Sequence, residues 1–122
     1  MLLNQTQFTD QLPVQAYESG RLKMNNQFFE HSVILKYGQM PTEWVVSTMQ
    51  TLSLSDLQPL LDEKPQVILL GTGEKLTFPS RELMKTISDS GFAIEIMDTG
   101  AASRTYNLLL AEGRRVIAGL IV

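Results

Sequence analysis

The sequence predicts an α/β fold: a single three-layer domain with a mixed β-sheet, flanking helices and an N-terminal β-hairpin. Apolar runs alternate with helical periodicity between residues 67 and 122, as consecutive strand–helix–strand units require. Two of the apolar strands end in loops of small residues, Gly71-Thr72-Gly73 and Asp98-Thr99-Gly100, and each loop leads into a helix. The 122 residues are enough for one domain spanning 1–122 with a proper core, and too few for two.

Composition and charge exclude several classes of function. The chain is 43% hydrophobic and 19% charged, which is ordinary for a soluble globular protein. The net charge is −3 and no block of lysine and arginine occurs, so nothing favours nucleic-acid binding. Cysteine is absent, which excludes disulfides and thiolate chemistry. No apolar run has membrane-spanning length and the start, MLLNQTQFTD, does not resemble a signal peptide, so we expect a cytoplasmic protein without membrane insertion.

The first twenty residues carry little hydrophobic periodicity and end in Ser19-Gly20. They predict a peripheral arm, residues 1–20, that packs on the domain through Phe8, Leu12 and Tyr17. Beyond this arm the pattern changes to short β-prone segments.

A β-hairpin is predicted from Arg21–Met24 and Gln27–Tyr37, joined by a turn at Asn25-Asn26. Side chains alternate along a strand, so His31 shares a face of the second strand with apolar residues such as Val33. We therefore expect a hydrogen-bonded, partly buried histidine rather than a catalyst or metal ligand.

The remaining helices and strands follow from apolar periodicity and from start and stop signals. Ser55 with Gln58 has capping-box spacing, and Pro59 then falls early in the helix. Gly91 and Gly113 end the second and third helices. The expected helices lie near 55–62, 80–89 and 101–112, and the expected strands near 67–70, 92–97 and 116–121.

Gly71-Thr72-Gly73 allows two interpretations. Adjacent glycines let backbone N–H groups approach an anion, but they also form tight turns that need a positive φ, and the turn is the commoner case. Leu76 stands where a dinucleotide fingerprint has its third glycine, and no Gly-Lys-Ser/Thr triplet of a P-loop occurs.

Asp98-Thr99-Gly100 imitates the active-site strand of dimeric aspartic proteases, in which two such aspartates share a proton. Those proteases are almost entirely β, whereas a helix and a strand are predicted after Gly100, so this alternative is remote. Thr99 is better interpreted as the N-cap of the third helix.

Arg104 is the candidate binding residue that stands out, because a cation in the first turn opposes the helix dipole. Asp98 is the expected partner if Arg104 is structural. Alternatively, Arg104 and Thr105 bind a carboxylate or phosphate together with the 71–73 backbone. Both loops leave the same edge of the sheet, where α/β proteins place ligands. The candidate ligand- or partner-binding residues are Gly71, Thr72, Gly73, Asp98, Thr99, Arg104, Thr105 and Asn107.

Residues 66–121 carry a specific pattern: L-G-T-G, then F-P, then G-F-x-I-E-x-M-D-T, then A-x-R-T-Y-N-x-L-x-x-E-G-R-x-V-x-A. This pattern resembles the family of small α/β proteins that includes mitochondrial respiratory complex I assembly factor three and bacterial and archaeal relatives of unknown function. The resemblance implies a three-layer domain with a mixed sheet and no established enzyme activity. The mitochondrial member acts through protein partners.

The leading hypothesis is a non-enzymatic binding or assembly module, with a protein partner or a second copy of itself. It rests on the resemblance and on the lack of a defensible nucleophile–base pair. The alternative is a small-molecule binding protein, or a weak enzyme, that uses the Gly71–Gly73/Arg104 edge for an anion or carboxylate. The dimeric aspartic protease acting through Asp98 is the third hypothesis. We expect no cofactor and no metal, since no second histidine or close carboxylate cluster accompanies His31.

Overall fold

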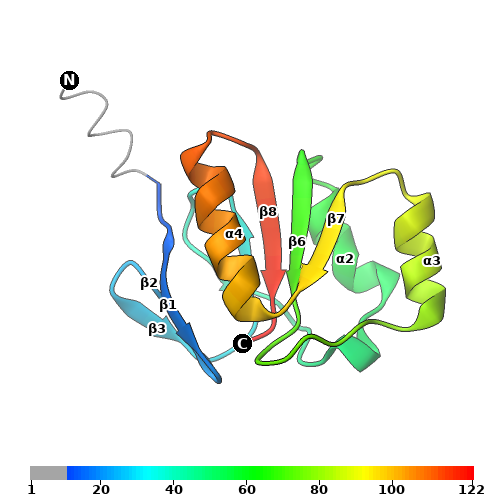
Figure 1. Ribbon diagram of the computed structural model, residues 1–122, viewed down its shortest axis with the longest axis horizontal. Helices are drawn as coiled ribbons and strands as arrows, with labels where there is room; N and C mark the ends of the chain where they lie inside the picture. Colours follow the sequence, from blue (N-terminus) through cyan, green and yellow to red (C-terminus); the bar gives the residue numbers. More distant parts are fainter. Residues whose placement is uncertain (1–10) are drawn as a thin grey trace.

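The computed structural model describes residues 11–122 and has the mixed α/β fold that the sequence predicts (Figure 1). Among these residues, two β-sheets and three α-helices pack in layers. The strands are β1 (Val14–Glu18), β2 (Arg21–Met24), β3 (Gln27–Phe29), β4 (Val33–Lys36), β5 (Thr42–Glu43), β6 (Val67–Gly71), β7 (Ile94–Met97) and β8 (Val116–Leu120). The helices are α2 (Leu54–Leu61), α3 (Arg81–Asp89) and α4 (Thr99–Ala111), and a short 3₁₀ helix, η1, covers Met49–Thr51.

The larger sheet has five strands in the order β5-β4-β8-β6-β7. Strand β6 runs parallel to both β7 and β8, whereas β4 runs antiparallel to β8 and to β5, so the sheet is mixed. Gly71 at the end of β6 is paired with Met97 on one side and Leu120 on the other. The loops that follow β6 and β7 and the residues that follow β8 therefore meet at one edge of the sheet.

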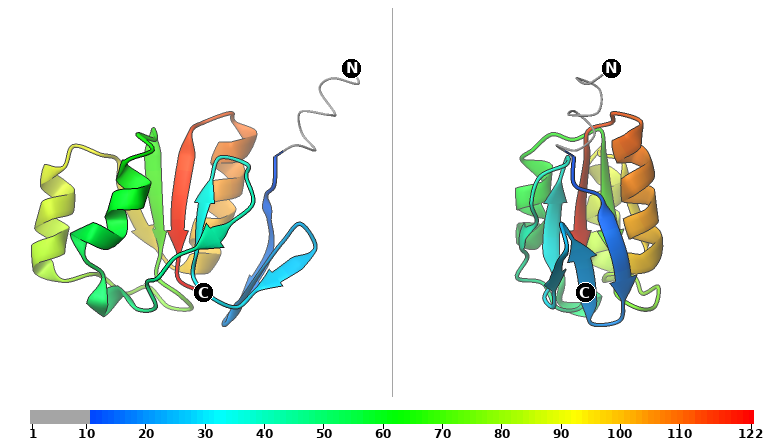
Figure 2. Two further views of the ribbon diagram at one scale, coloured as in Figure 1. Left: turned by 180° about the vertical axis from the view of Figure 1, so that it is seen from behind. Right: turned by 90° about the vertical axis from the view of Figure 1, so that its left-hand side faces the viewer.

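The two faces of this sheet carry separate apolar layers. On one face α4 and the small sheet pack over Val67 and Leu69, and on the other α2 and α3 pack over Ile68 and Leu70. The two views of Figure 2 show α2 and α3 together on one side and α4 on the opposite side. Because β6 is buried on both faces, it reads as a continuous apolar run rather than an alternating one.

The small sheet is antiparallel with the order β1-β2-β3, and its first strand was not predicted. Residues 14–18 form β1 and pair with β2, in place of an arm without regular structure. Leu12 and Tyr17 pack against the core as expected, and Phe8 lies outside the described residues. The alternation in β1 is weak because only Val14 is fully buried among its five residues.

The predicted hairpin forms at β2 and β3, and both turn residues, Asn25 and Asn26, have positive φ angles of 50° and 60°. The prediction of one long second strand was wrong, since β3 ends at Phe29 and β4 belongs to the larger sheet. His31 lies in the connection between them and is exposed rather than partly buried, with Nδ1 3.0 Å from the Ser32 carbonyl oxygen. The chain crosses between sheets here, so strand alternation does not extend through His31.

Helix α2 begins earlier than predicted, with Ser53 as its N-cap. The Ser53 hydroxyl accepts from the Asp56 N–H, and the Asp56 carboxylate accepts from the Ser53 N–H at 2.9 Å, which completes a capping box. The expected box of Ser55 and Gln58 does not form, because Gln58 Nε2 donates to Asp62 instead, at 2.8 Å.

Candidate functional site

The loop after β6 and the start of α4 form a closed joint, which we call the β6–α4 junction (Gly71–Gly73, Thr99 and Ile121). The Thr99 hydroxyl donates to the Ile121 carbonyl at 2.6 Å and accepts from the Gly73 N–H at 2.8 Å. The Thr99 N–H donates to the Gly73 carbonyl at 2.9 Å, and Thr99 is completely buried. This one side chain therefore ties the ends of β6 and β8 to the helix.

The glycines of the junction are explained by packing and backbone geometry. A Cβ on Gly71 would lie 2.7 Å from Leu120 Cδ2 and 2.9 Å from Thr99 Oγ1, so no larger residue fits without displacement. Gly73 has a φ of +101°, as the turn interpretation predicted.

The polar groups of the loop are occupied within the fold. The Thr72 N–H donates to the Met97 carbonyl at 2.9 Å, and the Thr72 hydroxyl donates to the Lys75 carbonyl at 2.6 Å. The same hydroxyl accepts from the Thr77 N–H at 3.2 Å. Since the N–H groups of Thr72 and Gly73 both have partners, this loop does not offer the backbone donors that an anion site at 71–73 requires.

The N-cap of α4 is Asp98, whereas the sequence had suggested Thr99. Asp98 Oδ1 accepts from the Ala101 N–H at 2.9 Å. The helix begins two residues before the predicted start near residue 101, so Thr99 is its first residue and its side chain enters the junction. Asp98 lies at a helix start in a mixed α/β fold, which excludes the all-β aspartic protease.

A shallow depression of about 160 Å³ lies between strand β1 and helix α4, and we call it the β1–α4 groove. Gly100 makes room for it, because a Cβ there would lie 3.3 Å from Asp98 Oδ1, 3.5 Å from Arg104 Nη1 and 3.8 Å from Tyr17 Cδ2. The groove is lined by Val14, Gln15, Ala16, Tyr17, Gly100, Ser103, Arg104 and Asn107.

Arg104 is exposed in this groove. Among residues 11–122 the ion pairs within 4.0 Å are Arg21–Glu18 and Lys36–Glu63, so the predicted Asp98–Arg104 pair is not formed. The Asp98 carboxylate is engaged by the helix N-terminus instead. Arg104 thus remains a cation without an ion-pair partner in the described part of the chain.

Asn107 lines the groove with Arg104 but has a structural task. Its Oδ1 accepts from the Val14 N–H at 2.8 Å, and its Nδ2 donates to the Val14 carbonyl at 2.8 Å. This pair of bonds fastens the free edge of β1 to α4. Thr105 does not line the groove: its hydroxyl donates to Met97 Sδ at 3.5 Å, toward β7.

The other polar side chains of the groove are also bonded within the fold. The Ser103 hydroxyl donates to the Thr99 carbonyl at 2.8 Å, and Gln15 exchanges two hydrogen bonds with Asn26. The Tyr17 hydroxyl donates to the Val122 carbonyl at 3.4 Å. Burial raises the pKa of Tyr17, and the negative charges of Glu74 and Asp98 raise it further.

The structure thus separates the eight predicted site residues. Arg104 and Asn107 share the groove, whereas the 71–73 loop and Thr99 form the junction beside it. Asp98 caps α4, and Thr105 contacts Met97 of β7. Sequence reasoning did not assign Gly100 and Ser103 to a site. Their spacing carried a signal, because positions 100, 103, 104 and 107 recur on one face of a helix.

Two chemical features are absent from the described part of the chain. Within residues 11–122, no three histidine, aspartate or glutamate side chains gather so as to hold a metal ion. No helix in this range combines the length and apolar character needed to span a bilayer.

The chain is similar to several known proteins. A family described as "Protein of unknown function (DUF498/DUF598)" matches residues 14–121. The 13 kDa major membrane protein of Francisella tularensis subsp. holarctica (strain LVS) is 34% identical over 101 residues, 82% of this chain and 82% of that protein. The NMR structure of a Xanthomonas campestris protein has a TM-score of 0.81 and 36% identity, and the match covers 91% of this chain and 84% of that one.

A further relative supports the resemblance seen in the sequence. NADH dehydrogenase (ubiquinone) 1 alpha subcomplex assembly factor 3 of Rattus norvegicus is 28% identical over 122 residues, 98% of this chain. The match spans 65% of the rat protein's length. With its matched residues covering most of the sequence, this chain belongs to the DUF498/DUF598 family, whose curated relatives include complex I assembly factor 3.

Proposed function

We propose that this chain is a non-enzymatic binding module that assembles with another protein, and that the β1–α4 groove is part of the contact. One observation carries the proposal: Arg104 is exposed at the groove without an ion-pair partner in residues 11–122, while the neighbouring polar groups are bonded within the fold. An exposed cation whose neighbouring carboxylate and hydroxyl groups (Asp98, Ser103 and Tyr17) are hydrogen-bonded within the fold suits recognition rather than catalysis.

The chemistry of Arg104 indicates an acidic group on the partner. A guanidinium binds a carboxylate through two parallel N–H···O bonds, and such charge-assisted bonds are stronger than neutral ones. Because α4 begins at Thr99, Arg104 is its sixth residue and lies in the second turn rather than in the predicted first turn, so the helix dipole acts on it only weakly. An aspartate or glutamate side chain of the partner, entering the groove beside Tyr17, supplies the carboxylate.

The name of the rat relative, an assembly factor, supports a role through protein contacts. The identity of the partner is not carried over with that name, since the match spans only 65% of the rat protein. The contact proposed for this chain is a carboxylate bound to Arg104.

A second candidate function is the binding of a free small anion. A groove of about 160 Å³ with one arginine accommodates a carboxylate of acetate size. The 71–73 amides are occupied, so Arg104 would be the main donor, and we rank this candidate below a protein partner. Titration with acetate and with inorganic phosphate, followed by NMR of the Arg104 side chain, distinguishes the two: saturation at low concentration favours the small anion.

The decisive variant is Arg104→Ala, with Arg104→Lys and Arg114→Ala as comparisons. Partners captured from the native cell by each tagged variant are quantified together with its thermal stability. We expect Arg104→Ala to change stability by no more than about 0.5 kcal/mol, because the side chain is exposed. We expect it to reduce binding by about 2–5 kcal/mol, the usual cost of removing one member of a desolvated charged contact.

The two comparison variants test whether binding depends on the guanidinium geometry of Arg104 and on its position in the groove. Arg104→Lys keeps the charge but not the planar fork, so binding should be recovered in part. Arg114 is also exposed but does not line the groove, and Arg114→Ala should bind as the wild type does. An Arg104→Ala protein that captures every partner but melts early would show that Arg104 is structural and would end the proposal.

We also propose that the module acts in the cytoplasm. No helix in residues 11–122 meets the requirements for crossing a bilayer, and no lysine- and arginine-rich block occurs in the sequence. The Francisella relative is named a major membrane protein, so location needs its own measurement. Fractionation of the native cell should recover this chain with the ribosome-free supernatant, and recovery with washed membranes would contradict the proposal.

A further inference from the structure

Strand β7 forms one edge of the five-stranded sheet, and among residues 11–122 no strand pairs with its outer side. Its inner side faces β6, as the Ile68 N–H bond to the Ala93 carbonyl at 2.8 Å and the Thr72 N–H bond to the Met97 carbonyl at 2.9 Å show. Backbone groups alternate in direction along a strand, so the N–H and C=O groups of Ile94 and Ile96 point outward. These groups are available to a further strand.

The opposite edge of the sheet is different. Strand β5 contains only two residues, Thr42 and Glu43, and both are exposed. Very short strands are one way in which proteins prevent pairing at a sheet edge. Strand β7 has four residues and no proline, so it keeps a usable edge.

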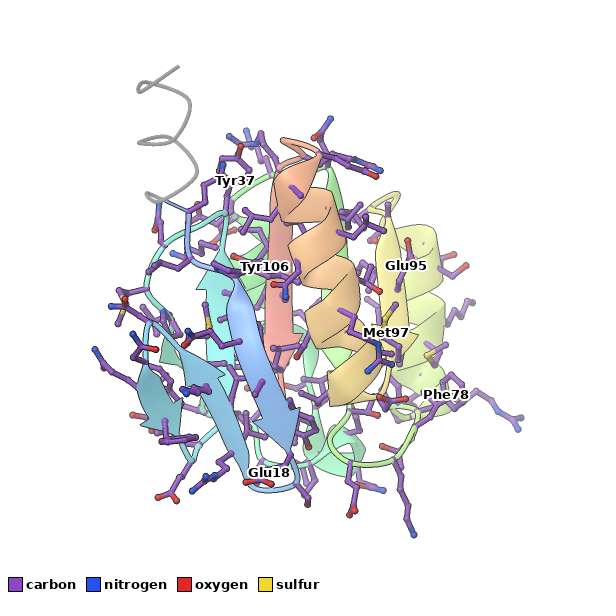
Figure 3. The ribbon with its side chains drawn as sticks, turned by 60° about the vertical axis from the view of Figure 1, so that its left-hand side comes forward. Glu18, Tyr37, Phe78, Glu95, Met97 and Tyr106 are labelled. Carbon is purple, nitrogen blue, oxygen red and sulfur yellow. The ribbon has the colours of Figure 1, made fainter. Side chains whose placement is uncertain are left out.

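The surface beside β7 combines apolar side chains with one acidic group. Phe78, in the loop after β6, is 58% exposed. Met97 is partly buried, and its sulfur accepts a hydrogen bond from the Thr105 hydroxyl, whereas Glu95 is exposed. In Figure 3, Glu95 and Met97 follow one another along β7, and Phe78 lies beyond the end of that strand.

Glu95 determines which kind of strand fits. Side chains directly opposite each other on neighbouring strands attract when their charges are opposite and repel when they are alike. Glu95 forms no ion pair within 4.0 Å in the described part of the chain. A second copy paired symmetrically about Glu95 would place two carboxylates opposite each other, which is unfavourable. A segment with a basic residue at this position neutralises the charge.

We infer that the β7 edge binds an extended segment of another protein as a sixth strand, with a lysine or arginine opposite Glu95. The outward backbone groups of Ile94 and Ile96 provide the hydrogen bonds, as in other strand additions. An apolar residue two positions from the basic one lies beside Met97 and covers apolar surface there. This surface is distinct from the β1–α4 groove and does not depend on Arg104.

The test uses the full chain, ¹⁵N-labelled, and an end-blocked seven-residue peptide, Thr-Val-Thr-Lys-Thr-Val-Thr. On one face of this peptide a lysine stands between two valines. The comparison peptide has glutamate in place of the lysine. We expect the lysine peptide to shift the amide signals of Ile94 and Ile96 saturably, because these N–H groups acquire new acceptors, and the glutamate peptide to bind about threefold to tenfold more weakly.

Charge reversal at the edge provides the matched variants. Glu95→Lys should weaken the lysine peptide about threefold to tenfold and make the glutamate peptide the better ligand. Glu43→Lys introduces the same change on the blunt edge β5 and should leave both affinities unchanged. Both side chains are exposed, so the spectra should show intact folds.

Several outcomes would overturn the inference. Signals of Ile94 and Ile96 that do not move at peptide excess would show that the edge is closed. Equal binding of both peptides, or equal effects of Glu95→Lys and Glu43→Lys, would remove the role of Glu95. If the unliganded chain sediments as a dimer and the β7 amides shift with its own concentration, the occupant is a second copy and the basic segment is excluded.

Discussion

The β6–α4 junction and the β1–α4 groove lie at the same end of helix α4, but their polar groups are used in opposite ways. In the junction, the Thr99 hydroxyl holds two backbone groups and is buried. In the groove, Arg104 is exposed and forms no ion pair in residues 11–122. The difference teaches that small residues at a strand end can close a fold, while an exposed cation stands on the helix that follows.

The largest expected effect separates the two regions through stability. Thr99→Val keeps the shape of the side chain but leaves the Gly73 N–H and the Ile121 carbonyl without their partner. Each unsatisfied buried group costs about 1–3 kcal/mol, so the free energy of unfolding should fall by about 2–6 kcal/mol. Urea denaturation measures this loss directly.

Thr105→Val is the matched control on the same helix. The Thr105 hydroxyl only contacts the Met97 sulfur, at 3.5 Å, which is a weak interaction. We expect a change within about 0.5 kcal/mol. Equal effects of the two substitutions would show that the junction does not depend on the Thr99 hydroxyl.

The next effect concerns Asn107, which lies in the groove but resembles the junction in its bonding. Asn107→Ala removes both bonds to Val14, whose side chain is buried, and should cost about 1–3 kcal/mol. Amide exchange at Val14 should become faster, because the first strand loses its attachment to α4. Unchanged exchange at Val14 would mean that the β1–β2 pairing alone holds the strand.

The prediction of the fold succeeded where burial of whole faces dictated the sequence pattern. Strand β6 is buried on both faces and reads as an unbroken apolar run, and α3 has its apolar residues Leu83 and Ile87 one turn apart. The prediction missed strand β1 because only Val14 among its residues is fully buried. The position of this strand depends on a hydrogen bond to Asn107, a residue far along the chain. Local sequence does not reveal such a long-range partner.

The proximity of the two loops was predictable, but the separation of a closed junction from a groove was not. That the 71–73 loop and the start of α4 come together follows from the parallel pairing of β6 and β7. Whether a hydroxyl or an amide there is free depends on which backbone group lies within hydrogen-bond reach, and Ile121 is 22 residues from Thr99. Because Asp98 and not Thr99 is the N-cap, the Thr99 side chain is buried in the core, whereas the predicted cap would have placed it at the surface.

The stability of the fold at alkaline pH distinguishes the buried Tyr106 from Tyr17, which lines the groove. Burial raises the pKa of Tyr106, and the Gly38 N–H that donates to its oxygen partly offsets this. The pKa of Tyr17 is raised by burial and by two nearby carboxylates. A raised pKa means that the folded protein keeps a proton that the unfolded chain releases once the pH exceeds the ordinary value of 10.0, so stability should be unaffected below that pH and fall above it.

Removing either phenol should reduce this alkaline loss of stability. Tyr106 is completely buried and Tyr17 only partly, so Tyr106→Phe should flatten the pH dependence more than Tyr17→Phe. Unfolding by urea below and above pH 10.0 measures the slope for each variant. A steeper slope in Tyr106→Phe than in the wild type would reverse the sign and contradict the linkage.

The smallest expected effect tests the boundary between the two regions at Asp98, which caps α4 and lies near Arg104 at Gly100. Asparagine caps helices as well as aspartate does, so Asp98→Asn keeps the bond to the Ala101 N–H and loses only the charge. Asp98 forms no ion pair with Arg104 that the substitution could break. The free energy of unfolding should therefore fall by less than about 1 kcal/mol, the usual stabilisation from a charge that interacts with the helix dipole. Asp98→Ala removes the cap itself and should cost more, about 0.5–2 kcal/mol.

If Asp98→Asn proves as damaging as Asp98→Ala, the negative charge of Asp98 stabilises this end of the helix, and Asp98 then acts on Arg104 through space. In that case Asp98→Asn should also strengthen the binding of an acidic partner in the groove, since one competing negative charge is gone. Partner affinity measured on the same variant distinguishes a cap from a charge that limits access to Arg104.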